Sequence, residues 1–210
     1  MVRMSRLVPI GAVSAAVVGC TRLVDGTALP PAALPAPAGV VDLGRIMLGT
    51  PRMRAIVGAD EQLTVIPTMD SSSPTDIDEL AATIPPPCRF IFAETAVFGS
   101  TATRFHKTTY QYPPKAAIVS EGAAVYPDTE AAHHVLDALV ATVAECADTS
   151  AGPGLVSDWT SDDASLRTHA GDCGRAYQVK SVVLLEVTYC GFSESDADLV
   201  VTNMASAVPG

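Results

Sequence analysis

The sequence predicts an α+β fold, a single domain with an antiparallel sheet flanked by helices and two disulfides. Of the 210 residues, 48% are apolar, which is enough for one sizeable core. Stretches with helical periodicity and stretches rich in β-branched residues follow one another in mixed order, without the regular alternation of a parallel sheet. The even number of cysteines beyond Cys20 favours disulfides in an exported chain.

The first twenty residues have the order of a bacterial lipoprotein signal. Arg3 and Arg6 precede an apolar stretch at 7–18, which is too short to cross about 30 Å of hydrocarbon as a helix. The small Gly19 and then Cys20 follow it, as in the bacterial lipobox. This resemblance implies a signal peptide at 1–19, cleavage before Cys20, and acylation of that cysteine. Several acyl chains on one residue give stable anchoring.

The chain after the lipidation site is rich in proline. Residues 27–38 contain four prolines, which exclude helix and favour extended polyproline II. We therefore expect a lipidated N-terminus and Pro-rich tether at 20–38, and a globular domain at 39–210.

Helices are expected where apolar residues recur with a period near 3.6. They lie at 40–57 (one or two short helices, broken near 49–51), at 76–84 (a helical turn ended by three prolines), at 128–146 and after Ser193. Asp128 is a suitable N-cap for the third. Ser193 and Asp196 form the pattern of a capping box. The apolar face of the last helix comprises Ala197, Val200, Val201, Met204 and Val208.

Strands are expected where β-branched and aromatic residues concentrate between turn signals. The expected strands lie at 63–69, 101–112, 116–126 and 181–189, with a shorter one around Trp159. The run at 181–189 is the most apolar, which predicts a central strand. Residues 89–98 are apolar and hold three of the five phenylalanines.

Four cysteines remain once Cys20 is set aside, and they allow three connectivities. The favoured pairs are Cys88–Cys146 and Cys173–Cys190, because the second pair would close a two-strand unit; the other pairings stay open at this point. A metal site is disfavoured, since the sequence has no Cys-x-x-Cys pair.

The order of landmarks in the domain resembles that of the PknH-like extracellular sensor domain, found in mycobacterial receptor kinases and in free-standing lipoproteins. The landmarks are Cys88, the run at 123–127, the helix that ends at Cys146, Trp159, the run at 173–177, the strand at 182–187, Cys190 and a C-terminal helix. The resemblance spans residues 40–208. It implies one α+β domain, the disulfide pairing favoured above, and a large cleft for an unidentified ligand.

Two positions depart from that family's usual pattern. Family members have a Trp shortly before the second cysteine. In this chain that stretch is Val143, Ala144 and Glu145 and contains no Trp. Family members also often have Asn at the position of Ser181. If either position lines the cleft, the ligand of this protein differs from that of its relatives.

Catalytic and metal motifs are missing from the sequence. It has no His-Glu-x-x-His and no Gly-x-Ser-x-Gly. His133 and His134 are adjacent on a helix and cannot share one ion. The aspartates around Trp159 do not match a calcium loop. We therefore expect no enzyme activity, no catalytic residue, no metal and no cofactor.

The candidate ligand-binding residues are Tyr126, Trp159, Arg175 and Glu186. Tyr126 and Trp159 each offer an amphipathic contact surface. Glu186 lies within an apolar strand, where a buried carboxylate needs a partner such as Arg175. An exposed face, a structural ion pair or ordinary sheet packing would also account for these residues.

The formal net charge is −10, and loss of the signal peptide would make the chain more acidic still. Such a chain repels nucleic acid, and its expected membrane partner is reached through the lipid on Cys20. The expected function is ligand binding or sensing on the extracytoplasmic face of the cell membrane, with an unknown small-molecule or envelope ligand. The alternatives are a module that docks an envelope protein partner, and a cryptic hydrolase.

Overall fold

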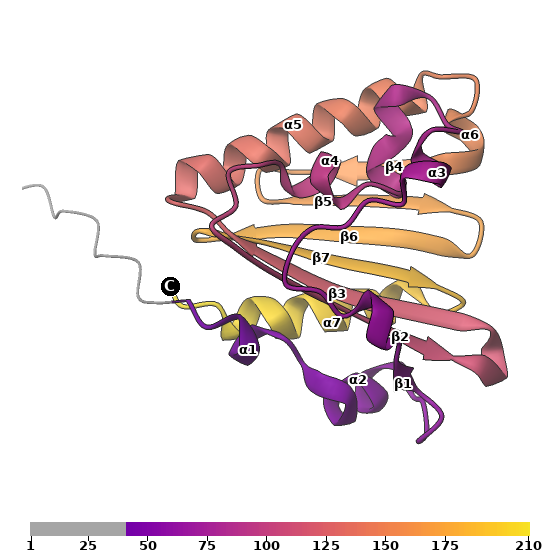
Figure 1. Ribbon diagram of the computed structural model, residues 1–210, viewed down its shortest axis with the longest axis vertical. Coiled ribbons are helices and arrows are strands. Elements are labelled where there is room, and N and C mark those ends of the chain that lie inside the picture. Colours follow the sequence, from indigo (N-terminus) through magenta and orange to yellow (C-terminus); the bar gives the residue numbers. More distant parts are fainter. Residues whose placement is uncertain (1–40) are drawn as a thin grey trace, which may run out of the picture. The chain divides into compact units, whose positions relative to one another are not determined.

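Seven antiparallel strands form the sheet around which the domain is built (Figure 1). The structure is a computed structural model that describes residues 41–210. The expected signal peptide, the lipidation site Cys20 and the tether lie outside the described residues. The strand order is β1-β2-β3-β7-β6-β5-β4. The strands are β1 Thr64–Val65, β2 Arg104–Tyr112, β3 Ala117–Val125, β4 Asp158–Ser161, β5 Ser165–Ala170, β6 Cys173–Lys180 and β7 Val183–Cys190. The fold class is confirmed, and β7 is the central strand, as its apolar sequence predicted.

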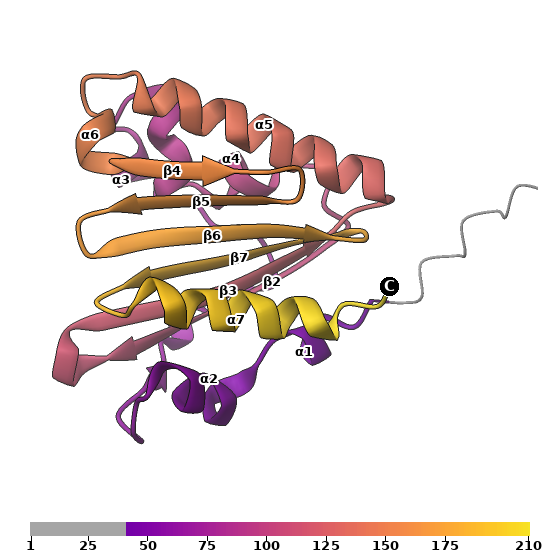
Figure 2. The same cartoon turned by 180° about the vertical axis from the view of Figure 1, so that it is seen from behind.

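Helices cover both faces of the sheet, and Figures 1 and 2 show the two faces in turn. α7 (Glu194–Ala207) packs on β6 and β7 from one side, together with α1 (Leu43–Ile46) and α2 (Gly49–Val57). α5 (Thr129–Ala147) packs on the other side, with the 3-10 helix η2 (Pro86–Ile91) and α4 (Glu94–Phe98). The remaining short helices are η1 Pro67–Met69, α3 Asp78–Ala81, η3 Pro113–Lys115 and α6 Gly152–Leu155. None of the helices in residues 41–210 is long and apolar enough to cross a membrane.

The two longest helices begin where their capping residues predicted. The Asp128 carboxylate accepts from the Ala131 N–H at 2.8 Å. Ser193 and Asp196 form a complete capping box at the start of α7. All five residues of the expected apolar face of this last helix are buried. Local sequence signals thus fix both helices, because a cap and an apolar stripe act within a few residues.

The two disulfides are Cys88–Cys146 and Cys173–Cys190. The first joins η2 to the end of α5. The second joins directly opposite residues of β6 and β7. Both therefore fasten elements on the α5 side of the sheet.

The structure differs from the sequence expectations in three strands, since β6 (Cys173–Lys180) also lies outside the expected strand ranges. The strand expected at 63–69 is only two residues long, because Pro67 starts a 3-10 helix. The polar strand β5 was not expected. Its sequence, Ser-Leu-Arg-Thr-His-Ala, has little apolar alternation, and pairing with β4 and β6 determines its conformation.

Buried Glu121 joins the N-terminal helices to the sheet. Its carboxylate accepts from the Leu48 N–H at 2.9 Å and from the Tyr110 hydroxyl at 3.1 Å. Leu48 is the N-cap of α2 and makes no side-chain cap of its own, and Glu121 on β3 satisfies the Leu48 N–H at the start of this helix. Burial raises the pKa of Glu121, although both hydrogen bonds act to lower it.

The raised pKa predicts a pH-dependent stability. The folded pKa lies above the ordinary 4.5, so the stabilisation from this proton is complete below that value and is lost as pH rises through the folded pKa. We expect the wild type to lose free energy of unfolding relative to Glu121→Gln as the pH rises above 4.5. Urea titrations at several pH values measure this difference. Glu145→Gln, at an exposed site on α5, should show no such change, and a flat difference for Glu121→Gln would contradict the assignment.

Candidate ligand-binding site

A cavity of about 570 Å³ opens on the α5 side of the sheet. Its floor comes from strands β2, β3, β5, β6 and β7, and most of its wall comes from residues 68–98, which we call the cover segment. α6 contributes Gly154 and Leu155 at one side. The volume lies within the range of about 300–1,000 Å³ that is typical of small-molecule sites.

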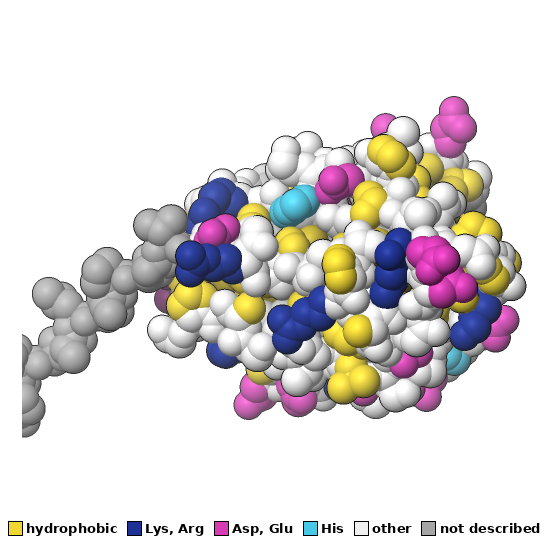
Figure 3. All heavy atoms as spheres, turned by 90° about the horizontal axis from the view of Figure 1, so that it is seen from below, with side chains coloured by type: hydrophobic (Ala, Val, Ile, Leu, Met, Phe, Trp, Pro, Cys, Tyr) yellow, Lys and Arg dark blue, Asp and Glu magenta, His cyan; other side chains and the backbone are white. Residues whose placement is uncertain are grey.

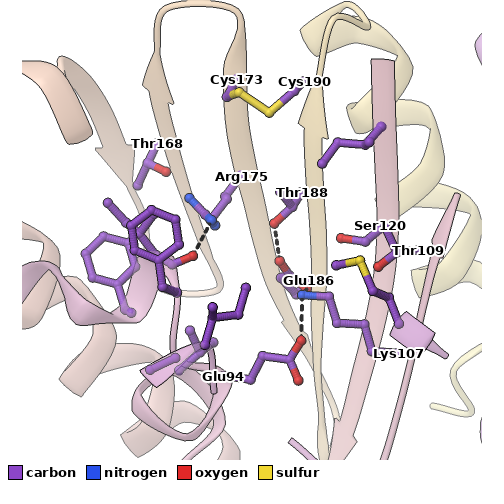
Figure 4. Close-up of a pocket in the computed structure, with 18 of the residues that line it drawn as sticks. Glu94, Lys107, Thr109, Ser120, Thr168, Cys173, Arg175, Glu186, Thr188 and Cys190 are labelled. Atoms are coloured by element: carbon purple, nitrogen blue, oxygen red, sulfur yellow. Dashed lines mark hydrogen bonds and ion pairs between the residues drawn. A yellow bond between two sulfur atoms is a disulfide. The ribbon is translucent and has the colours of Figure 1, made fainter. Parts of the chain in front are cut away.

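The floor is polar because the register of the strands aligns polar side chains in two rows. Each row crosses the sheet on the face that alternation directs toward α5. The first row is Lys107, Gly122, Glu186, Tyr177 and Leu166. The second row is Thr109, Ser120, Thr188, Arg175 and Thr168. Figure 4 shows most of these side chains directed into the same space.

The wall is apolar and comes from the cover segment. Its apolar lining residues in η2 and α4 are Phe90, Ile91, Val97 and Phe98. Met69 and Ile77 also line the cavity but are 42% and 46% exposed, so they lie at its rim. The cavity therefore joins a polar floor to an apolar wall with an apolar rim.

Lys107 links the floor to the wall. Its Nζ lies 3.1 Å from Glu186 Oε2 on the central strand and 3.1 Å from Glu94 Oε1 on the cover segment (Figure 4). Burial alone would lower the pKa of Lys107, but the two carboxylates outweigh it and raise the pKa above its ordinary value. Lys107 therefore stays a cation at neutral pH.

Gly122 makes this ion pair possible. It lies on β3, between Lys107 of β2 and Glu186 of β7. A Cβ at this position would lie 3.0 Å from Glu186 Oε2. The lysine therefore reaches the central strand across a residue that has no side chain.

Arg175 was expected as a partner for Glu186, but Lys107 takes that place. Arg175 Nη2 instead donates to the Ile91 carbonyl at 2.7 Å, which gives the cover segment a second attachment to the floor. Thr188 donates to Glu186 Oε1. Arg175 and Glu186 both line the cavity and belong to adjacent rows of the floor.

Three polar atoms on the floor are buried without a hydrogen-bond partner. They are Thr109 Oγ1, Tyr177 OH and Glu186 Oε2, and residues 41–210 contain no other buried side-chain polar atom in this state. Glu186 Oε2 has the nearby Lys107 ammonium but accepts no well-aligned hydrogen bond. Burial raises the pKa of Tyr177, so its hydroxyl keeps its proton. Buried polar groups are normally paired, and all three of these atoms belong to residues that line one cavity.

The other two candidate residues lie outside the cavity lining. The Tyr126 hydroxyl donates to the Phe98 carbonyl at 2.9 Å within the core under α5. Trp159 lies on the edge strand β4 and packs, partly buried, against the same core. Lys107, Glu94 and Tyr177 line the cavity but were not among the four candidate residues. The only signal was a lysine inside a strand, which a solvated face explains as well.

Neither departure from the family pattern lines the cavity. Val143 is buried in the core under α5. Ser181 lies in the turn before β7 with a φ of 55°, a left-handed conformation that Asn also tolerates. No histidine lines the cavity, and residues 41–210 hold no cluster of side chains able to bind a metal ion.

The family profile described as PknH-like extracellular domain matches residues 39–208. The chain belongs to this family. The crystal structure of the extracellular domain of PknH from Mycobacterium tuberculosis is similar in fold, with a TM-score of 0.54 and 15% sequence identity. The match covers 79% of this chain and 93% of that one. No curated protein matches the chain. The resemblance seen in the sequence is confirmed, and this PknH-like domain belongs outside the cytoplasm.

The ion pair across Gly122 predicts a steric effect. Gly122→Ala should lower the free energy of unfolding by about 1–3 kcal/mol, because the new methyl group displaces a carboxylate held by Lys107 and Thr188. Gly154→Ala is the control, since its Cβ would meet nothing within 4 Å. Urea denaturation compares the two variants. An unchanged stability for Gly122→Ala would mean that Glu186 can move away without loss.

Proposed function

We propose that this protein is a lipid-anchored, non-enzymatic binding or sensor protein of the cell envelope, and that its small ligand occupies the cavity beneath the cover segment. The observation that carries the proposal is the pair of buried hydroxyls without a hydrogen-bond partner, on Thr109 and Tyr177, beside the Lys107–Glu186 ion pair at the same cavity. Each unpaired atom costs about 1–3 kcal/mol, and a ligand that pairs with them would offset this cost.

A docking module for an envelope protein is the alternative. It would favour an exposed apolar patch away from any deep cavity. The exposed large apolar residues of the described chain are Met69, Ile77, Leu80 and Leu199. Three of these four lie on the cover segment, and two of them line the cavity. Their position favours a role at the rim of a binding site.

The proposed surroundings of the domain follow from its family and from the N-terminal signal. An extracellular domain requires export, and the lipobox at Cys20 supplies a membrane anchor without a spanning helix. The mixed charges fit this setting. Lys and Arg side chains alternate with Asp and Glu on the face shown in Figure 3, which therefore offers no single-sign patch for nucleic acid.

Tyr177→Phe tests the cavity directly. Removing an unpaired buried hydroxyl should leave the free energy of unfolding unchanged or raise it by up to about 1 kcal/mol, while ligand binding weakens. Tyr126→Phe is a matched control, because it removes a hydroxyl that is paired with Phe98. It should cost about 1–2 kcal/mol and leave binding intact.

The binding readout is native mass spectrometry of the mature chain from Thr21 onward, secreted by an actinobacterial host with both disulfides formed. We expect an extra mass that organic extraction removes, present in the wild type and in Tyr126→Phe and reduced in Tyr177→Phe. Equal occupancy in the two tyrosine variants would place the ligand elsewhere. A wild type without extra mass would count against a tightly held ligand.

Cys20→Ala tests the anchor. Without the acylated thiol, the protein should leave the detergent phase after Triton X-114 partitioning, or remain unprocessed. Cys20→Ser is a closer replacement and should behave in the same way. Unchanged partitioning of both variants would contradict the lipobox interpretation.

A further inference from the structure

The charges around the cavity are unevenly distributed. Lys107 lies between two carboxylates, Glu94 and Glu186, so this trio carries one more negative than positive group. Its most buried member is Glu186, with a side chain 4% exposed, and the two carboxylates of the trio share the single ammonium of Lys107. A carboxylate oxygen can only accept. The trio therefore favours a ligand group that donates hydrogen bonds and carries positive charge.

The adjacent row supplies the opposite charge. Arg175 pairs with Thr188 in the register of β6 and β7, and Tyr177 pairs with Glu186. Arg175 is therefore the diagonal neighbour of Glu186 on the same face of the sheet, at a separation of about 7–8 Å. A guanidinium has five N–H donors, and in the described chain the Arg175 guanidinium makes one hydrogen bond to protein, to the Ile91 carbonyl. The other donors favour an anionic oxygen.

The remaining hydroxyls fit a compact head group between these two charges. Tyr177 OH lies in the row of Glu186, and Thr109 Oγ1 lies in the row of Arg175. Both are unpaired, and each can donate or accept. The apolar wall then faces the rest of the ligand, and the exposed Met69 and Ile77 mark the side on which an apolar chain would enter.

We propose that the cavity binds an amphiphile with a single apolar chain and a compact zwitterionic head. The head places an ammonium against Glu186 and an anionic oxygen against Arg175, while the chain lies along the wall of the cover segment. This inference rests on the proposed function and specifies its ligand. Two sources share the chemistry, namely a single-chain aminophospholipid from the membrane and a short apolar peptide with free termini.

The three lipid probes have the same acyl chain and differ in their head groups. Lauroyl lysophosphatidylethanolamine has an ammonium and a phosphate, lauroyl lysophosphatidylcholine has a cation without N–H donors, and lauroyl lysophosphatidylglycerol has no cation. The dipeptide Leu-Phe represents the peptide source. Calorimetric titration below the micelle concentration uses the same unlipidated mature chain, after organic extraction of any bound ligand and refolding.

We expect the ethanolamine lipid to bind about tenfold more tightly than the choline lipid, because a hydrogen bond to a charged group is lost in the second. Glu186→Gln should abolish this preference and leave the bond from Thr188 possible. Arg175→Gln should weaken the binding of both phospholipids by a similar factor. Arg167→Gln is the matched control, since Arg167 pairs with Asp198 on the opposite side of the domain, and it should change neither affinity.

Binding of Leu-Phe alone, with the same dependence on Glu186 and Arg175, would support the head chemistry and identify the peptide source. Equal affinity for the ethanolamine and choline lipids, or binding of no probe, would overturn the inference. An extracted native ligand without an ammonium, whose binding depends on Tyr177, would also overturn it but would leave the proposed function standing.

Discussion

The contact of Lys107 with two carboxylates is the constraint on which the cavity depends. It joins an inner strand, the central strand and the cover segment through one side chain that is 13% exposed. Burying these charges costs desolvation energy, so the trio need not add net stability. Removing the lysine would leave the buried Glu186 carboxylate and the partly exposed Glu94 carboxylate without a cation between them, which is destabilising. The main effect of the Lys107 contacts is to fix the position of the cover segment above the strands of the floor.

The disulfides reinforce the same two surfaces. Cys88–Cys146 fastens the base of the apolar wall to α5, and Cys173–Cys190 lies on the floor at the end of the polar rows. Each constrains the unfolded chain by roughly 3–4 kcal/mol in the entropy model. Covalent and ionic contacts therefore fix the wall relative to the floor, although two of the hydroxyls that line the cavity remain unpaired. Unpaired polar atoms kept at one place in an otherwise satisfied interior are typical of a site shaped for binding.

The two sides of the sheet have separate roles. On the α7 side, buried Glu121 is paired with the start of α2 and with Tyr110, so its carboxylate serves the structure. On the α5 side, buried Glu186 pairs with Lys107 and accepts from Thr188 in the lining of the cavity. Chemically identical residues on neighbouring strands thus differ in what they can do, and only their surroundings distinguish them. At 15% identity to the PknH domain, the shared fold leaves the ligand of each protein to its own lining residues.

The sequence by itself determined the elements that depend on local interactions. The caps at Asp128 and Ser193, the apolar face of α7 and the apolar run of the central strand could all be located because their causes act within a few residues. The order of landmarks also identified the family. The site was predicted only in part. Glu186 and Arg175 were named and line the cavity, Tyr126 and Trp159 do not line it, and Lys107, Glu94 and Tyr177 were not among the four candidates. The tertiary structure decided these points because the register across four strands, and the absence of a side chain at Gly122, determine which distant polar groups meet.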